Sequence, residues 1–399
     1  MEIKVNMIEA VALAIVVLFV GVFLKRKIKF FERFCIPAPV IGGLLFSFIT
    51  LAGYCTDIFF FTIEENLKSI FMLAFFTTIG YGASFKRIKR GSKDLVILMV
   101  LVVILIILQD IIAFAIAPVF DLHPLLALCT GSVSMVGGHG TALAWGPEFE
   151  KIGIVGASGV AVAAATFGLV AGSLIGGPIG RRLIERNKLL DKQQTVDYNE
   201  NTVSEENKTE KKLSKNGVIH GIYQIALAMG IGSVLSTFLQ SIGLLFPIYV
   251  GALVVAALLR NISDFSGKFK IDFAEIDVIG QACLAIFLSM ALMTLKLWQL
   301  AELAVPMLVM LFAQILLMIM FAYFVIFRFL DKDYDSAVIT AGVCGFGMGA
   351  TPNAMANMEA LTFRYRPSPK AFLIVPIVGV MFADIINSAF ILILVNIFK

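Results

Sequence analysis

The stretches Gly137-Gly138-His139-Gly140-Thr141 and Gly345-Phe346-Gly347-Met348-Gly349-Ala350-Thr351-Pro352-Asn353 interrupt two otherwise apolar segments. Glycine and proline both disfavour a continuous helix. In hydrocarbon, each unpaired backbone N–H or C=O costs several kcal/mol, so broken helices are tolerated only where protein buries them or where they line a cavity. One such break in each half of an apolar chain is typical of the binding site of a secondary transporter.

The composition indicates an integral membrane protein. Of the 399 residues, 59% are hydrophobic and only 15% are charged, whereas a soluble domain is roughly 45–50% apolar and about 25% charged. A bilayer core needs about 20 apolar residues per helix. The sequence predicts ten spans, near 7–24, 38–55, 67–85, 95–118, 153–180, 218–240, 244–260, 276–297, 300–327 and 371–397.

The loop charges predict how these spans are oriented. With both termini placed outside, 27 of the 32 lysines and arginines fall in inside loops, as the positive-inside rule requires. This holds only if both glycine-rich stretches return to the side from which they enter. They are therefore interpreted as re-entrant hairpins, the first at about 124–146 from outside and the second at about 335–358 from inside.

The predicted fold class is an all-α polytopic membrane protein with two inverted five-helix repeats, each with its own hairpin. The N-terminal repeat would cover 1–182 and the C-terminal repeat 218–399. The polar, mixed-charge segment 183–217 is interpreted as a cytoplasmic linker, because it has too few apolar residues to form a core.

Local patterns recur at a nearly constant offset and favour a duplication. Pro39-x-x-x-Gly43 recurs as Pro247-x-x-x-Gly251, 208 positions later, and Gly138-x-Gly140 recurs as Gly347-x-Gly349, 209 positions later. An odd number of spans per half turns the second repeat upside down, and inverted repeats are typical of secondary transporters.

The hairpin tips are the candidate substrate site. A helix that begins inside the membrane presents free backbone N–H groups and a positive dipole end, which together attract a carboxylate. His139 could instead be a hydrogen-bonded structural imidazole. The candidate substrate-binding residues are Gly137, Gly138, His139, Gly140, Thr141, Gly347, Gly349, Ala350, Thr351 and Asn353.

Asp384 is the candidate centre of a cation site. It lies near the middle of the last span, where a charge costs about 2.5–3.5 kcal/mol, and no lysine or arginine is predicted at that depth. Asn387 follows on the same helix face, and Thr166 could add a third oxygen, a set that suits Na+. The alternative is a protonated or hydrogen-bonded structural aspartate. Asp110 is interpreted as a polar contact between helices.

Three segments carry a resemblance to a known family: Ser134–Thr141, Ala165–Val170 and Cys344–Pro352. With Asp384 and Asn387 they resemble the bacterial sodium/glutamate symporters over nearly the whole chain. The resemblance implies Na+-coupled uptake of L-glutamate, a homodimer in the bacterial cytoplasmic membrane, and an elevator-type mobile core that holds both hairpins. It implies no enzyme activity and no cofactor other than Na+ as coupling ion. Phe346 departs from the pattern of the first tip, which has Gly137 there.

Other functions remain open at this point. A tip that binds a carboxylate through its backbone recognises the negative charge and not the rest of the substrate. Aspartate, citrate and malate are therefore alternative substrates. A channel should show a continuous polar face, but most spans are apolar all round. An enzyme should show a nucleophile with a base or a metal cluster, yet the three histidines have no ligand spacing.

Overall fold

The computed structural model describes residues 2–34, 36–84, 86, 93–190, 214–243, 246–267, 271–300 and 303–398. Most of the expected linker 183–217 lies outside these residues, which resume at Ser214. At the N-terminal end of this expected linker, helix α10 (Ala157–Arg186) continues beyond the predicted end of the fifth span.

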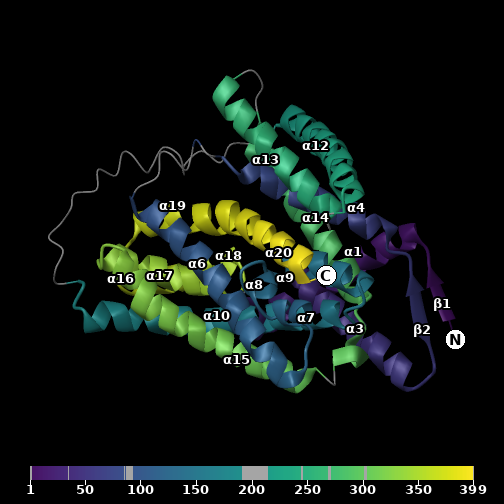
Figure 1. The fold of residues 1–399 in the computed structure, drawn as a ribbon, viewed down its shortest axis with the longest axis horizontal. Helices are drawn as coiled ribbons and strands as arrows, with labels where there is room; N and C mark the ends of the chain where they lie inside the picture. Colours follow the sequence, from purple (N-terminus) through teal and green to yellow (C-terminus); the bar gives the residue numbers. More distant parts are fainter. Residues whose placement is uncertain are drawn as a thin grey trace.

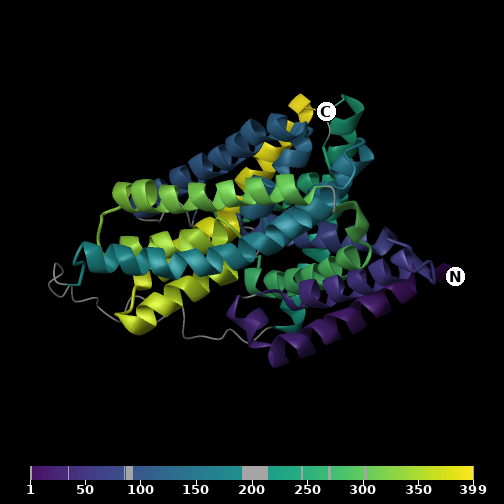
Figure 2. The same cartoon turned by 90° about the horizontal axis from the view of Figure 1, so that it is seen from below.

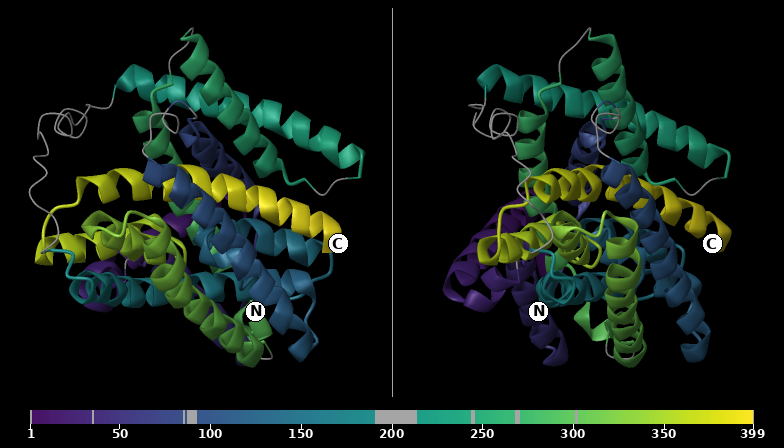
Figure 3. Two further views of the ribbon diagram at one scale, coloured as in Figure 1. Left: turned by 60° about the vertical axis from the view of Figure 1, so that its left-hand side comes forward. Right: turned by 90° about the vertical axis from the view of Figure 1, so that its left-hand side faces the viewer.

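Six helices form a flanking group. Each helix of this group packs against the next in the order α1, α3, α14, α4, α13, α12. Figures 1 and 3 show α12 and α13 lying together on one side of the molecule, and Figure 2 shows α1 at another edge. The group comprises α1 (Met7–Lys27), α3 (Ala38–Cys55), α4 (Asn66–Gly82), α12 (Lys215–Ser241), α13 (Ile248–Ser266) and α14 (Phe273–Met293).

The remaining long helices form a hairpin group around α10, which contacts α9, α15, α17 and α18. The two groups meet at several places, among them the contacts of α9 with α14 and of α4 with the π-helical segment η4 and with α20. The group comprises α6 (Lys93–Ile116), α7 (Pro124–Leu128), α8 (Ser132–Met135), α9 (Gly138–Lys151), α10 (Ala157–Arg186), α15 (Ala304–Met320), α17 (Tyr334–Phe346), α18 (Thr351–Arg364), α19 (Pro369–Pro376), η4 (Ile377–Ala383) and α20 (Asp384–Phe398).

Short elements complete the described chain. Strands β1 (Glu2–Val5) and β2 (Phe60–Ile63) pair in parallel, with Glu2 opposite Phe60 and Val5 opposite Ile63. The expectation of helices alone is therefore wrong for these strands, which join the start of α1 to the loop after α3. The other short elements are α2 (Lys29–Arg33), α16 (Phe327–Phe329), the 3-10 turns η1 (Ala117–Phe120) and η2 (Leu297–Leu300), and the π-helical segment η3 (Phe321–Ile326).

The prediction of a helical multi-pass protein is confirmed. Nine helical segments within the described residues are long and apolar enough to cross a membrane, one fewer than predicted. The expected span 67–85 is α4, whose 17 residues reach about 25 Å, the lower limit for a spanning helix. Both π-helical segments lie inside longer spans, Ala304–Phe329 and Pro369–Phe398.

Both glycine-rich stretches separate two helical arms. In the second, α17 ends at Phe346 and α18 begins at Thr351, and the two arms pack against each other. In the first, the arm before the break is itself interrupted between α7 and α8, and α9 continues to Lys151. The arms of both therefore extend past the predicted ends at 146 and 358.

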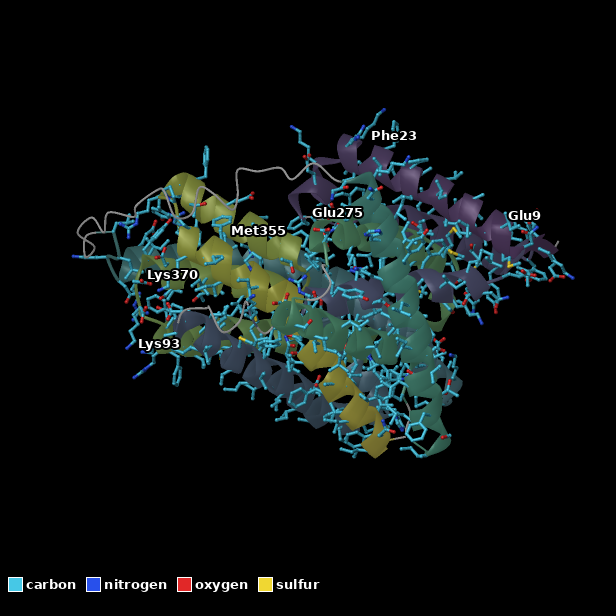
Figure 4. The ribbon with its side chains drawn as sticks, turned by 90° about the horizontal axis from the view of Figure 1, so that it is seen from above. Glu9, Phe23, Lys93, Glu275, Met355 and Lys370 are labelled. Carbon is cyan, nitrogen blue, oxygen red and sulfur yellow. The ribbon has the colours of Figure 1, made fainter. Side chains whose placement is uncertain are left out.

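The ends of the hairpin group opposite the tips are joined by charge pairs. Lys370, at the start of α19, pairs with the buried Asp94 of α6 and donates to Asp331 at 3.2 Å. This hydrogen bond lowers the pKa of the Asp331 carboxyl. Figure 4 shows Lys93 and Lys370 at the same end of the molecule, away from Glu9 on α1. These ion pairs thus connect the start of α6 and the start of α19 with the loop that precedes the second hairpin.

A ladder of glycines lets α10 lie against the backbone of the second hairpin. The residues are four apart, Gly168, Gly172, Gly176 and Gly180, so they share one helix face. A Cβ atom at Gly168 would lie 2.1 Å from the Met348 carbonyl oxygen, and one at Gly176 would lie 2.1 Å from Asn357 Nδ2. Small residues that allow such close approach are typical of helix contacts in membranes.

We predict that Gly176→Ala destabilises the protein, because the new methyl group meets an amide and the Ala341 carbonyl, both fixed by packing. Overpacking of this kind costs typically 1–3 kcal/mol. The control is Gly177→Ala, where a Cβ atom meets nothing within 4 Å. In detergent, thermal unfolding should shift down for the first variant and stay equal or rise for the second. Equal shifts of the unfolding temperature in the two variants would contradict the role given to the glycine ladder in helix packing.

Candidate functional site

A cavity of about 290 Å³ lies between the two helix groups. Its walls on the flanking side include Phe75 and Thr78 of α4 and Asp277 and Gln281 of α14. On the other side, it is lined by both hairpin tips and by the start of α20, through Gly137, Gly138, His139, Gly140, Thr141, Gly349, Ala350, Thr351, Pro352 and Asp384. Most of the residues expected at a substrate site thus face one cavity.

Two helices begin at this cavity. Helix α9 starts at Gly138 and α18 starts at Thr351, and no side-chain hydrogen bond caps either N-terminus in the described part of the chain. The first N–H groups of a helix have no partner within it, and the dipole places about half a positive charge at that end. Two uncapped N-termini facing one space form an environment that favours an anion.

The two tips touch each other. Gly138 has a left-handed backbone with φ of +58°, which favours glycine. A Cβ atom here would also lie 2.6 Å from the Gly349 carbonyl oxygen. Residues 211 positions apart are therefore in backbone contact, and the glycine at 138 is required both by its conformation and by its neighbour.

Asp384 follows a distorted stretch of its helix. Pro376 lacks a backbone N–H, and the next seven residues, Ile377–Ala383, form a π-helical segment. π-Bulges inside helices occur often at functional sites. The Asp384 carboxylate faces the cavity, and none of the ion pairs among the described residues includes it. A cation in the cavity would supply the missing counter-charge.

The other predicted sodium ligands are engaged elsewhere. Thr166 donates to the Val162 carbonyl at 2.9 Å, and its oxygen lies 3.0 Å from His139 Nε2. Asn387 is buried and donates from Nδ2 to the Ser132 carbonyl at 2.9 Å, while its Oδ1 has no partner among the described residues. Neither residue lines the cavity with Asp384. Their role as ligands stays a prediction.

Two predicted substrate contacts also lie off the cavity. The Gly347 carbonyl accepts a hydrogen bond of 2.8 Å from Gln109 Nε2, and Asn353 Nδ2 donates to the Leu169 carbonyl at 2.7 Å. Both residues hold the second tip against neighbouring helices, so their part in substrate binding stays a prediction. His139 lines the cavity and its Nε2 lies 3.0 Å from the Thr166 hydroxyl oxygen, as expected of a hydrogen-bonded imidazole, while its contact with a substrate stays a prediction.

Asp110 braces the first hairpin. Its Oδ1 accepts from the Ser132 backbone N–H at 2.8 Å and its Oδ2 accepts from the Ser132 hydroxyl at 3.0 Å. The carboxylate therefore satisfies an N–H group at the start of α8, where the preceding arm is interrupted. This agrees with its interpretation as a polar contact between helices.

The flanking residues Phe75, Asp277 and Gln281 were not expected in the site. Asp277 and Gln281 lie four positions apart on α14, and Gln281 Nε2 donates to Asp277 Oδ2 at 3.4 Å. A polar pair at this spacing inside an apolar segment was a usable signal. Nothing in the sequence indicated Phe75, whose ring lies 3.1 Å from the position of a Cβ atom on Gly140.

A multi-pass helical protein in which two interrupted hairpins and an intramembrane acid surround one cavity belongs to the class of secondary transporters. The profile of the sodium/glutamate symporter family matches residues 3–367. The chain belongs to this family of transporters, which are not enzymes.

Curated relatives agree with the family profile. The chain is 41% identical over 383 residues to the sodium/glutamate symporter of Haemophilus influenzae, covering 96% of this chain and 95% of the relative. It is 38% identical over 380 residues to the sodium/glutamate symporter of Escherichia coli, covering 94% of each. The similarity thus extends over nearly the whole chain.

We predict that Gly138→Ala disturbs the contact between the tips. A left-handed backbone costs an L-residue roughly 1–2 kcal/mol, and the methyl group also meets the Gly349 carbonyl, which cannot rotate away. Thermal unfolding in detergent measures the loss. Gly140→Ala is the control, because its methyl group meets only the edge of the Phe75 ring. If both variants lost equal stability, the tip contact would not be the cause.

Proposed function

We propose that the protein takes up L-glutamate together with Na+ across the bacterial cytoplasmic membrane. The observation that carries the proposal is one cavity shared by two helix N-termini and the Asp384 carboxylate, which among the described residues have no side-chain cap and no ion-pair partner, respectively. An amino acid with two carboxylates needs anion-binding groups, and a coupling cation needs an anionic ligand. The names of the relatives favour glutamate over aspartate, citrate or malate.

The substrate would bind through the backbone of both tips. Its carboxylates would accept hydrogen bonds from the first N–H groups of α9 and α18, and the hydroxyls of Thr141 and Thr351 line the same cavity. Hydrogen bonds to a charged acceptor are about twice as strong as those between neutral groups. The flanking wall adds the amide of Gln281 and the carboxylate of Asp277, either of which suits an ammonium group.

Na+ would neutralise Asp384. A hard cation is bound by oxygen atoms, and helix breaks supply backbone carbonyls beside the carboxylate. Thr166 and Asn387 would complete the shell after small side-chain movements, because the Oδ1 atom of Asn387 is buried without a partner in the described part of the chain. Sodium bound here would also screen the substrate carboxylates from Asp384, which couples the two ligands.

Transport would proceed by an elevator movement of the hairpin group along the flanking group. The flanking group takes three helices from each half, and the hairpin group takes the rest. The cavity reaches Pro37, Gly82 and Phe273, at ends of α3, α4 and α14 next to loops with many positive charges. This supports an inward-open arrangement, with both chain termini outside.

An inverted duplication accounts for this division of helices. The N-terminal half, 1–182, and the C-terminal half, 218–399, would each be one five-helix repeat with a re-entrant hairpin. The linker 183–217 would join them. Pro37 precedes α3 and Pro247 precedes α13, both with extended backbones.

In a homodimer, a second copy of the chain would hold the flanking group in place while the hairpin group moves. Helices α12 and α1 expose apolar side chains, among them Tyr223, Val234 and Phe19. These faces suit lipid and a second copy of the chain.

The test of the function is uptake into liposomes. With Na+ high outside and equal K+ inside, we expect labelled glutamate to accumulate above its external concentration, since the ion gradient supplies the free energy. The control imposes the same salt on both sides. Uptake that only equilibrates would contradict coupling, and competition with aspartate, citrate and malate measures selectivity.

Asp384→Asn should abolish Na+-dependent uptake, because the neutral amide cannot balance a bound cation. Sodium-induced thermal stabilisation of the purified protein should vanish as well. Asp121→Asn serves as the control, because Asp121 is exposed in a left-handed turn that asparagine also tolerates. Normal uptake by the Asp384 variant would remove this residue from the ion site.

A further inference from the structure

A second cavity, of about 640 Å³, lies at the far end of α10, beside the end of α18. It shares no residue with the cavity between the helix groups. Four arginines line it, Arg181, Arg182 and Arg186 of α10 and Arg364 of α18, together with a single acid, Glu185. The side chains of the cavity therefore carry a formal charge of +3.

The Glu185 carboxylate already has hydrogen-bond partners. Glu185 Oε1 accepts from Arg181 Nε at 2.9 Å and from the Tyr365 hydroxyl at 2.8 Å. Arg186 donates to the Tyr323 hydroxyl at 2.5 Å, and the Arg364 guanidinium lies over the Tyr365 ring at 5.6 Å. Among the described residues, no carboxylate forms an ion pair with Arg182, Arg186 or Arg364. Positive charge is left without an anion.

Helix ends alone do not account for this gathering. Both helices end here, and a cation near a helix C-terminus contributes about 0.3–1 kcal/mol. That effect, like positive-inside placement, leaves the arginines free to point in any direction. Here arginines of two helices converge on one space. Guanidinium forks match the oxygen atoms of a phosphate group.

The apolar surroundings identify the kind of anion. Pro178, Ala360 and Leu361 also line the cavity. Leu174 precedes Pro178 and Arg181 by four and seven positions, so it lies on the same face of α10, one turn deeper in the span, and it is 51% exposed. An apolar, exposed face that leads into a basic cavity at a helix end fits a lipid with its headgroup in the cavity.

We propose that this cavity binds the phosphate headgroup of an anionic phospholipid from the cytoplasmic leaflet. The proposal rests on the orientation given above, in which this end of α10 is cytoplasmic. The arginines hold the headgroup, and an acyl chain follows the Leu174 face. Because α10 and α18 both belong to the hairpin group, the lipid anchors the moving part of the protein at the membrane surface.

The test is native mass spectrometry of the purified full-length protein, titrated with short-chain phosphatidylglycerol or phosphatidylcholine in the absence of Na+ and glutamate. We expect phosphatidylglycerol to bind preferentially. The double variant Arg182→Gln/Arg364→Gln should weaken it roughly 30-fold, since each basic side chain near an anionic headgroup contributes about 1 kcal/mol. A failure here leaves the transport function untouched, because no transport ligand is present.

The matched control is Lys25→Gln/Arg26→Gln, which removes two basic residues from the last turn of α1. An equal loss in the control would overturn the site, as would equal binding of the two lipids. Inorganic phosphate that competes as well as phosphatidylglycerol would identify a free-anion site and overturn the lipid. Arg182→Lys keeps the charge at an exposed position but loses the planar fork, so it should bind phosphatidylglycerol more tightly than the double variant and less tightly than the unchanged protein.

Discussion

The structure depends on direct contact between backbones at the second hairpin. Gly168 and Gly172 bring α10 against the carbonyls of Met348 and Cys344, and Gly138 brings the first tip against Gly349. No larger side chain fits at these places. Because unpaired backbone groups are costly in an apolar medium, the broken helices must be enclosed by other helices or face a cavity. The N-termini of α9 and α18, which no described side chain caps, lie at the cavity between the two helix groups.

Buried amide side chains hold this arrangement together. Gln109, Gln314, Asn353, Asn357 and Asn387 each donate to a backbone carbonyl of another element. A buried polar group without a partner costs about 1–3 kcal/mol, so these bonds resist separation of the helices that they join. The hairpin group therefore moves as one body in the proposed mechanism, and its contacts with the flanking group, among them those of α9 with α14 and of α4 with η4 and α20, are the ones that change.

The helices follow from local sequence patterns, whereas the hydrogen-bond partners of the polar side chains do not. Nine predicted spans and both breaks were found, because apolar length and the glycine-rich stretches are local properties. The extra interruption near Thr130 and the strand pair were missed, because both depend on distant partners, Asp110 in one case and Phe60–Ile63 in the other. The amide groups of Asn353 and Asn387 donate to backbone carbonyls of other helices, contacts that their residue type alone does not indicate, and their roles as ligands stay predictions.

The sequence by itself determined a membrane protein with two helix breaks and an acid, Asp384, in its last apolar segment, since hydropathy and the conformational freedom of glycine act locally. Only the tertiary structure decided that the breaks touch, that Asp277 and Gln281 form the opposite wall, and that four arginines share a cavity. These facts depend on which helix faces meet. Contacts between residues 200 positions apart leave no local pattern from which packing could be deduced.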